Sequence, residues 1–191
     1  MGDKYKKLEN SVLPDGTDKG EAVSTTLGWY AVYTRMHHER KVAQRLKEQG
    51  VDTYVPLQTV TRQWSDRLKK VEVVVIPTIF FIRIALEQRL KVLKDPSVSY
   101  ILSAPGDSKP TVIPDYQMEQ FRFMVENADS PIDFESDSLV EGCRVRVIKG
   151  SLKGLEGTFL ETRGRTKLFI KLKTLGNVSV VISPKEIELI K

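Results

Sequence analysis

Six basic side chains crowd the start of a predicted helix, and their types and spacing suit chemistry on phosphate groups. They are Arg35, His37, His38, Arg40, Lys41 and Arg45. Lysine and arginine neutralise phosphate, and arginine or histidine can also stack on or hydrogen-bond to exposed bases. The same residues also fit an ordinary solvated helix face. A nucleic-acid contact is therefore one hypothesis, and the sequence leaves the simpler interpretation open beside it.

The adjacent histidines do not predict a metal site. Neighbouring residues on a helix point about 100° apart, and no cysteine or carboxylate cluster supports His37 and His38 in the sequence. We expect no metal ion and no cofactor.

Catalysis is not indicated either. The chain lacks the phosphate-binding, dinucleotide-binding, nucleophile-elbow and zinc-protease motifs. Its one cysteine, Cys143, has no obvious base and stands where a strand is expected to begin. We therefore predict no catalytic residue and no enzyme activity.

The composition is that of an ordinary soluble protein. Of 191 residues, 29% are charged and 40% are hydrophobic, and no apolar run approaches the ~20 residues that a membrane helix needs. The N-terminus lacks the apolar core of a signal peptide. One cysteine cannot form an internal disulfide, which suits a reducing compartment. We expect a cytoplasmic protein without membrane contact.

The net charge of +5 is distributed unevenly along the chain. Residues 142–191 carry +7, residues 127–141 carry −5 with no lysine or arginine, and residues 28–126 carry +4. An acidic strip between two basic blocks predicts a domain boundary. We therefore expect a disordered tail over 1–27, a first domain over 28–126, a flexible acidic linker over 127–141 and a second domain over 142–191.

The first domain is predicted to mix strands and helices. Strands are expected over 28–33, 53–60, 69–76, 78–84 and 98–102, and helices over 35–49, 86–93 and 114–127. Very short links join two of the strand pairs, which implies antiparallel pairing. We expect an α+β fold in which one antiparallel sheet carries helices packed on one face.

The second domain is predicted to be all β. Val145 and Val147 alternate with arginines, the period-two pattern of a half-buried strand. Glycines follow at the turn and at the entry to the next strand, where positive φ or close backbone approach is needed. Five short strands are expected over 144–149, 155–161, 167–173, 178–182 and 187–190. This number of strands in fifty residues predicts a small SH3-like β-barrel.

Several motifs in the right order resemble one protein family. They are Trp29-Tyr-Ala-Val, Glu39…Val42-Ala43…Leu46, Pro77…Phe81, Val98-Ser-Tyr-Ile and the run from Gly142 to Gly157. Together they cover about 150 residues and are similar to NusG-family transcription elongation factors, in which an NGN domain precedes a KOW domain. The segment Asp52–Pro56, the absence of a long insertion and the polar N-terminal tail look more like specialised members, the RfaH-like antiterminators or the UpxY subgroup of capsular polysaccharide operons.

The resemblance implies a non-enzymatic, monomeric factor. In this family the NGN domain sits on the clamp helices of the largest subunit of RNA polymerase, touches the gate loop and suppresses pausing and termination. The KOW domain recruits ribosomal protein S10 or the termination factor Rho in the general members. The alternative is a ribosome-associated or general RNA-binding KOW protein, because similar barrels occur there.

The resemblance also assigns site residues. An exposed apolar patch for the polymerase would comprise Tyr33, Ile79, Phe81 and Ile101, although ordinary core packing explains them too and Ile79 stands where the family usually has an aromatic residue. Arg89 and Lys91 lie where the family touches the gate loop. RfaH-like proteins read the non-template DNA strand with the region of the six basic residues.

Leu152 and Leu175 are the candidates for binding a partner of the second domain. Each is an apolar residue in a loop beside glycines, where exposure is costly unless a partner covers it. They align with the surface that the family uses for S10 or Rho, but each could also fold back over the end of the barrel.

Overall fold

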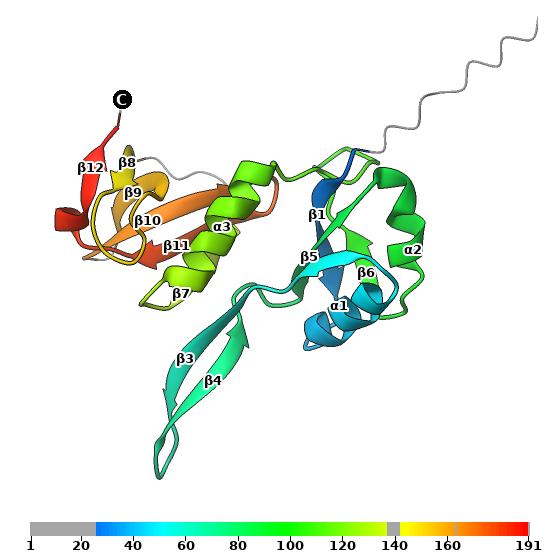
Figure 1. Cartoon of the computed structure of the whole chain (residues 1–191), viewed down its shortest axis with the longest axis horizontal. Helices are drawn as coiled ribbons and strands as arrows, with labels where there is room; N and C mark the ends of the chain where they lie inside the picture. The colour runs from blue at the N-terminus through cyan, green and yellow to red at the C-terminus, as the bar shows by residue number, and fades with distance from the viewer. Residues whose placement is uncertain (1–25, 137–141, 163, 191) are drawn as a thin grey trace, which may run out of the picture.

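A computed structural model describes residues 26–136, 142–162 and 164–190. Figure 1 shows two sheets, a projecting hairpin and one long helix between the sheets. The tail expected over 1–27 and residues 137–141 of the expected linker fall almost wholly outside the described residues.

The first sheet has four antiparallel strands in the order β2-β5-β1-β6. Their bounds are β1 Gly28–Thr34, β2 Asp52–Tyr54, β5 Ile79–Ile84 and β6 Val98–Ile101. The predicted α+β domain with an antiparallel sheet is confirmed.

Helices cover both faces of this sheet, so the expectation of helices on one face is wrong. Helices α1 (Glu39–Glu48) and α2 (Arg89–Leu93), the latter preceded by the 3-10 turn η1 (Leu86–Gln88), pack on one face. Helix α3 (Asp115–Asn127) covers the other. The reason lies in β5, whose residues are almost all buried and alternate between the two faces. A sheet that is apolar on both sides must be covered on both.

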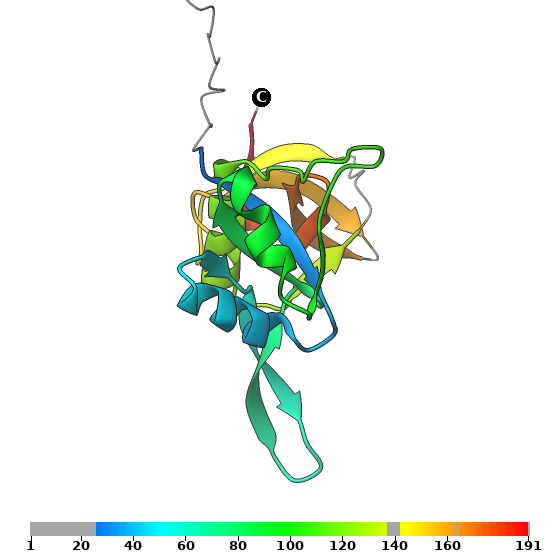
Figure 2. The ribbon, with the colours of Figure 1, turned by 90° about the vertical axis from the view of Figure 1, so that its right-hand side faces the viewer.

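Strands β3 (Leu57–Gln63) and β4 (Leu68–Val74) form a hairpin of their own. Figure 2 shows it extending away from the rest of the molecule. The single strand expected over 53–60 is divided between β2 and β3, because Pro56 lies between them and cannot donate to a sheet ladder.

The second sheet contains the five expected strands and one more, in the order β12-β8-β9-β10-β11-β7. The bounds are β7 Ile132–Glu135, β8 Cys143–Val147, β9 Glu156–Thr162, β10 Arg165–Leu172, β11 Gly176–Val181 and β12 Ile187–Leu189, with a 3-10 turn η2 at Pro184–Glu186. Glycine is required at position 157 of β9, because a Cβ there would lie 2.5 Å from the carbonyl oxygen of Phe169 in the neighbouring strand β10. The two end strands, β12 and β7, are not paired in this order, so a closed barrel stays a prediction.

The sixth strand, β7, comes from the segment expected to be a flexible linker. It pairs antiparallel with β11, from Asn177 opposite Glu135 to Val180 opposite Ile132. The Lys167 ammonium lies 2.9 Å from the Asp133 carboxylate and 3.3 Å from that of Glu135. The acidic strip is thus partly a strand held to the second domain by charge, and the linker prediction is wrong for these four residues.

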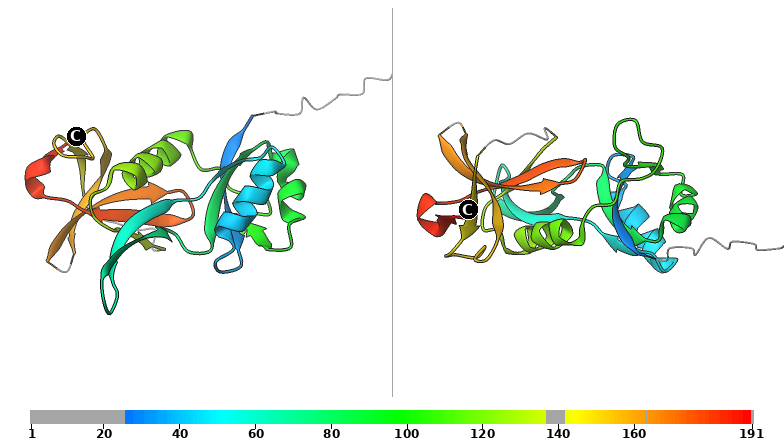
Figure 3. Two further views of the ribbon diagram at one scale, coloured as in Figure 1. Left: turned by 60° about the horizontal axis from the view of Figure 1, so that its bottom comes forward. Right: turned by 90° about the horizontal axis from the view of Figure 1, so that it is seen from above.

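Helix α3 joins the two sheets into one apolar cluster. The Phe121 ring meets the Phe81 ring of the first sheet edge-on at 5.6 Å between centroids. The Gln117 side-chain oxygen accepts a hydrogen bond from the Lys173 backbone N–H, at 2.8 Å, at the end of β10. The left view of Figure 3 shows α3 between the two sheets. The first sheet, α3 and the second sheet are therefore packed as consecutive layers.

One buried side chain fastens β3 to the segment that follows α3. The Gln58 side chain donates to the Ser130 carbonyl at 2.8 Å and accepts from the Ile132 N–H at 3.0 Å. Gln58 therefore satisfies both a donor and an acceptor of the backbone immediately before and within β7.

An ion pair fixes α1 to the loop before β6. Both oxygens of Asp95 accept hydrogen bonds from Arg45 at 2.8 Å, and Asp95 also accepts from the Ser97 N–H. The Asp95 side chain is only 6% exposed. The hydrogen bond from Arg45 is the main cause of a lowered pKa at Asp95.

Replacing Gln58 should loosen the junction between the two sheets. Gln58→Met leaves a buried N–H and a carbonyl without partners, which costs about 1–3 kcal/mol of unfolding free energy. Denaturant unfolding measures the loss, and amide hydrogen exchange at Ile132 should accelerate. Gln63→Met, on the exposed part of the same strand, is the control. Unchanged exchange at Ile132 would contradict the assigned bridge.

Replacing Asp95 should give a pH-dependent loss of stability. Because its pKa is lowered in the folded protein, the stabilisation is fully present above the unfolded pKa of about 4 and disappears as pH falls through the lower folded value. Asp95→Asn should cost about 1–3 kcal/mol at neutral pH and progressively less in acid. Thermal unfolding at several pH values tests this, with exposed Asp107→Asn as control. A difference independent of pH argues against the ion pair as its cause.

Candidate functional site

Three of the six predicted basic residues line one cleft between α1 and the hairpin. They are His37, Arg40 and Lys41, and Arg62 of β3 joins them from the other wall. The cleft has a volume of about 730 Å³. Four basic residues from two separate elements thus border one concave surface, an arrangement that suits a phosphate chain.

The turn into α1 is held in an uncommon conformation at the mouth of this cleft. His37 is exposed and has φ 62°, in the left-handed region that costs a residue with a side chain of order 1 kcal/mol. The next residue, His38, shares a hydrogen bond of 3.1 Å between its Nδ1 and the Ser97 hydroxyl. His38 is therefore engaged in the fold, whereas His37 stays accessible.

A buried carboxylate supports the base of the cleft. Glu39 is 4% exposed, and its Oε1 accepts a hydrogen bond of 2.6 Å from the Thr78 N–H. Thr78 also has positive φ, at 66°. Glu39 thereby fixes the turn between the hairpin and β5 against the start of α1, so the two walls of the cleft are positioned together.

Arginines in this region differ in whether an acidic side chain already binds them. Arg40 reaches across to Glu72 of β4 at 3.0 Å, with both side chains about half exposed, so an incoming phosphate can compete for it. Arg35 is exposed beside the cleft. Arg45 is bound in the ion pair with Asp95, which corrects its assignment as a free phosphate ligand.

An aromatic pair lies where β1 ends, just before the chain enters the cleft. The rings of Tyr33 and Tyr100 stack at 4.5 Å between centroids, with 16° between their planes. Burial, followed by the neighbouring Tyr100, raises the pKa of Tyr33. Tyr100 is 49% exposed. Tyr33 is partly buried against the core, so the pair combines a fixed ring with an accessible one, which suits an anchor for a protein partner.

The expected apolar patch does not exist as four exposed residues. Ile79 and Phe81 are buried in the cluster that α3 covers, and Ile101 is buried on the opposite face, in the cluster with α1. The cause is strand alternation: Tyr33 is opposite Tyr100, whereas its neighbour Val32 is opposite Ile101. Tyr100 was therefore missed, although the period of two places it on the same face as Tyr33.

Arg89 and Lys91 are exposed on α2. The Lys91 ammonium donates to the Gln49 carbonyl at the C-terminal end of α1. Leu90 between them is also exposed, at 61%, and Val92 is the residue of α2 that is buried. Both basic residues are accessible, and their proposed contact with a gate loop stays a prediction.

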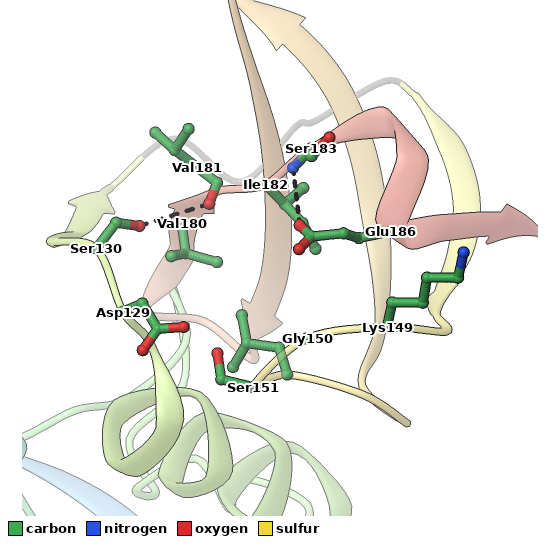
Figure 4. A pocket seen from close by; sticks show the side chains of 11 residues that line it. Asp129, Ser130, Lys149, Gly150, Ser151, Val180, Val181, Ile182, Ser183 and Glu186 are labelled. Atoms are coloured by element: carbon green, nitrogen blue, oxygen red, sulfur yellow. Dashed lines mark hydrogen bonds between the residues drawn. The ribbon is translucent and has the colours of Figure 1, made fainter.

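Leu152 and Leu175 are buried, at 6% and 5% exposure, in keeping with the alternative that each folds back rather than standing exposed at a loop tip. Leu152 lines a pocket with Asp129 and Ser130, the residues that follow α3. Figure 4 shows this pocket, where the Ser130 hydroxyl donates to the Val181 carbonyl. Leu175 lies two residues beyond Lys173, which binds α3. The segment from α3 to β7 thus borders the pocket that Leu152 lines.

The described residues offer no group of three histidine, cysteine or acidic residues close enough to hold a metal ion. Cys143 is exposed at the start of β8. Within the same part of the chain, no helix is long and apolar enough to cross a membrane, and the longest, α3, has 13 residues.

Comparison with known proteins shows which family this chain resembles. The family model described as transcription termination factor NusG matches residues 27–122, which hold the first sheet, the hairpin and most of α3. The transcription termination/antitermination protein NusG of Lactococcus lactis subsp. lactis (strain IL1403) is 25% identical over 171 residues, covering 83% of this chain and 90% of the relative.

A solved structure of Thermotoga maritima NusG, described as showing domain interaction, shares the fold. Its TM-score is 0.52 at 20% identity, over 87% of this chain and 98% of that one. With a family match over half of its length, the chain belongs to the NusG family of non-enzymatic transcription termination and antitermination factors.

Proposed function

We propose that this NusG-family factor binds RNA polymerase through its first domain and suppresses pausing or termination. Family membership supports the role, because the matched family and relative act in transcription termination and antitermination. The observation that carries it is the stacked pair of partly buried Tyr33 and exposed Tyr100, which precedes a basic cleft along the chain.

The aromatic pair is the proposed protein contact, on the clamp helices of the largest polymerase subunit. Tyr33 is already held by its neighbour and loses little side-chain freedom on binding, which favours affinity. Ile79 and Phe81 contribute by shaping the sheet beneath Tyr33, since both are buried. Arg89 and Lys91 are proposed to meet the gate loop from α2.

The cleft is the proposed contact with the displaced non-template DNA strand. His37 and Lys41 have no acidic partner within 4 Å among the described residues, and Arg40 has only an exposed one. Such side chains are available to phosphates at low cost, because a surface ion pair contributes little that must be given up.

The second domain is proposed to recruit a further factor, ribosomal protein S10 or Rho, through the end that carries Leu152 and Leu175. Both leucines are buried, and Leu152 lines a pocket with Asp129 and Ser130 of the segment that follows α3. Recruitment through these leucines therefore requires that this end of the domain separate from the segment that follows α3.

A specialised role at particular operons, such as those for polysaccharides, is supported only by the RfaH-like and UpxY-like features of the sequence. The alternative of a ribosome-associated or general RNA-binding protein gains no support from the second domain. Its aromatic residues Phe159 and Phe169 belong to or pack against the core, whereas RNA readers display such rings.

Removing the aromatic pair should weaken polymerase binding without unfolding the protein. Tyr33→Ala and Tyr100→Ala are each expected to raise Kd for core polymerase by about 5- to 30-fold, the range of interface anchors. Surface-immobilised polymerase and circular dichroism measure binding and folding. Tyr116→Ala, which removes an exposed tyrosine of α3, is the control. Wild-type affinity in both folded variants would remove this assignment.

Neutralising the cleft should reduce the effect on transcription. His37→Ala combined with Lys41→Ala should raise the concentration needed for half-maximal pause suppression by about 10-fold at low salt. The difference from wild type should shrink as salt rises, because the variant makes fewer phosphate contacts for salt to weaken. Lys47→Ala with Lys94→Ala, exposed lysines away from the cleft, is the control. An in vitro assay on matched and foreign leader templates measures this. Equal activity on every template contradicts the specialised role.

A further inference from the structure

The β3–β4 hairpin has features that the fold does not explain. It forms a separate two-stranded sheet, a unit that is marginally stable alone in water. Figures 1 and 2 show it projecting from the body of the molecule. Its tip exposes two large apolar side chains, Trp64 at 50% and Leu68 at 68%. A projecting hairpin with an exposed apolar tip is stabilised when a ligand buries that tip.

The charges on the outer half of the hairpin are arranged unfavourably for a free arm. Arg62 lies directly opposite Lys69 in the register, and like charges in that position destabilise a strand pair. Neither they nor Lys70 have an acidic partner within 4 Å among the described residues, while Asp66 faces Arg67 at 3.8 Å. Residues 62–70 carry a net charge of +3. An anion bridging the opposed pair removes the repulsion.

The tip combines this charge with an aromatic surface. The Lys69 ammonium lies 5.1 Å from the centroid of the Trp64 ring. Half of the Trp64 side chain nevertheless stays open to solvent. Aromatic faces flanked by basic side chains are the platforms on which unpaired bases stack.

The hairpin is continuous with the cleft. Arg62 lines the cleft beside His37 and Lys41, and Trp64 follows two residues further along the chain. From Val74 at the cleft to Leu68 near the tip, β4 spans about 20 Å at ~3.3 Å per residue. A polynucleotide strand that leaves the cleft can therefore follow basic residues to the tip.

We propose that the outer half of the hairpin is a second single-strand-binding element, in which Arg62 and Lys69 neutralise phosphates and a base stacks on Trp64. It rests on the proposed nucleic-acid contact of the cleft, which it extends. An unpaired strand fits better than a duplex, because only an unpaired base offers its face to the ring. It also fits better than a protein partner, because three unpaired cations surround the apolar tip.

Tryptophan fluorescence of the full chain tests the stacking directly. The other tryptophan, Trp29, is buried at 6% exposure, so quenching by an oligonucleotide reports on Trp64. A 12-nucleotide single-stranded DNA, the same sequence as RNA, and duplex DNA are the probes. Single strands should quench the emission, and Trp64→Leu should abolish quenching and weaken binding by about 5- to 100-fold. The tighter of the DNA and RNA probes identifies the source of the strand.

Salt dependence tests the phosphate contacts. For single strands the slope of log K against log[salt] is about −0.7 per phosphate neutralised, so Arg62→Gln with Lys69→Gln should make it less steep by about 1.4. Lys47→Gln with Lys94→Gln is the matched charge control and should leave the slope unchanged. An unaltered slope together with unaltered quenching in the hairpin variants overturns the proposal.

The remaining outcomes separate this proposal from the one on which it rests. If His37→Ala with Lys41→Ala loses oligonucleotide binding and the hairpin variants do not, the cleft proposal is supported and the hairpin proposal is overturned. The reverse result overturns the cleft proposal and supports the hairpin proposal. Equal binding of duplex DNA without quenching overturns the stacking. Failure of all oligonucleotides to bind, with reduced polymerase affinity in Trp64→Leu, assigns the tip to a protein contact and overturns the proposal.

Discussion

The position of α3 between two apolar surfaces is the constraint on which the rest of the structure depends. Phe121 packs on Phe81 of the first sheet, and Gln117 binds the end of β10 in the second. Because α1 and α2 already occupy the opposite face of the first sheet, α3 is what keeps water from Ile79 and Phe81. The sheet fixes the helix, and the helix in turn fixes the second domain.

The proposed binding surfaces therefore differ in whether packing within the protein already involves them. The aromatic pair and the basic cleft are reached without rearrangement of the first domain, and the helix on which the cleft is built is anchored by Arg45 and Asp95. The end of the second domain with Leu152 instead borders the chain's own Asp129 and Ser130. A partner of that end competes with intramolecular packing, so its apparent affinity is reduced by the fraction of molecules in which the end is covered.

Local patterns predicted the elements but not their partners. Alternating valines and glycine spacing were enough to predict the five strands of the second domain. The resemblance points to Ile101, whereas the side chain that stacks on Tyr33 is that of its neighbour Tyr100, because a shift of one residue reverses the face of a strand. Arg45 resembled a free cation because Asp95, fifty residues later, is not indicated by any local pattern. Residues 132–135 were assigned to a linker by charge, although isoleucine and phenylalanine alternate there with the acidic residues, as in a half-buried strand.

Pairing of β7 with β11 sets the length of the tether between the domains. While β7 is docked, only the four residues from Ala128 to Pro131 separate α3 from the second sheet. Undocking leaves the 15 residues from Ala128 to Gly142 between α3 and β8, 11 more than before. Each residue adds up to about 3.5 Å of reach, and the local concentration of one domain around the other falls as the tether lengthens. Because Lys167 holds Asp133 and Glu135 by charges that salt screens, the radius that the second domain can search grows with ionic strength.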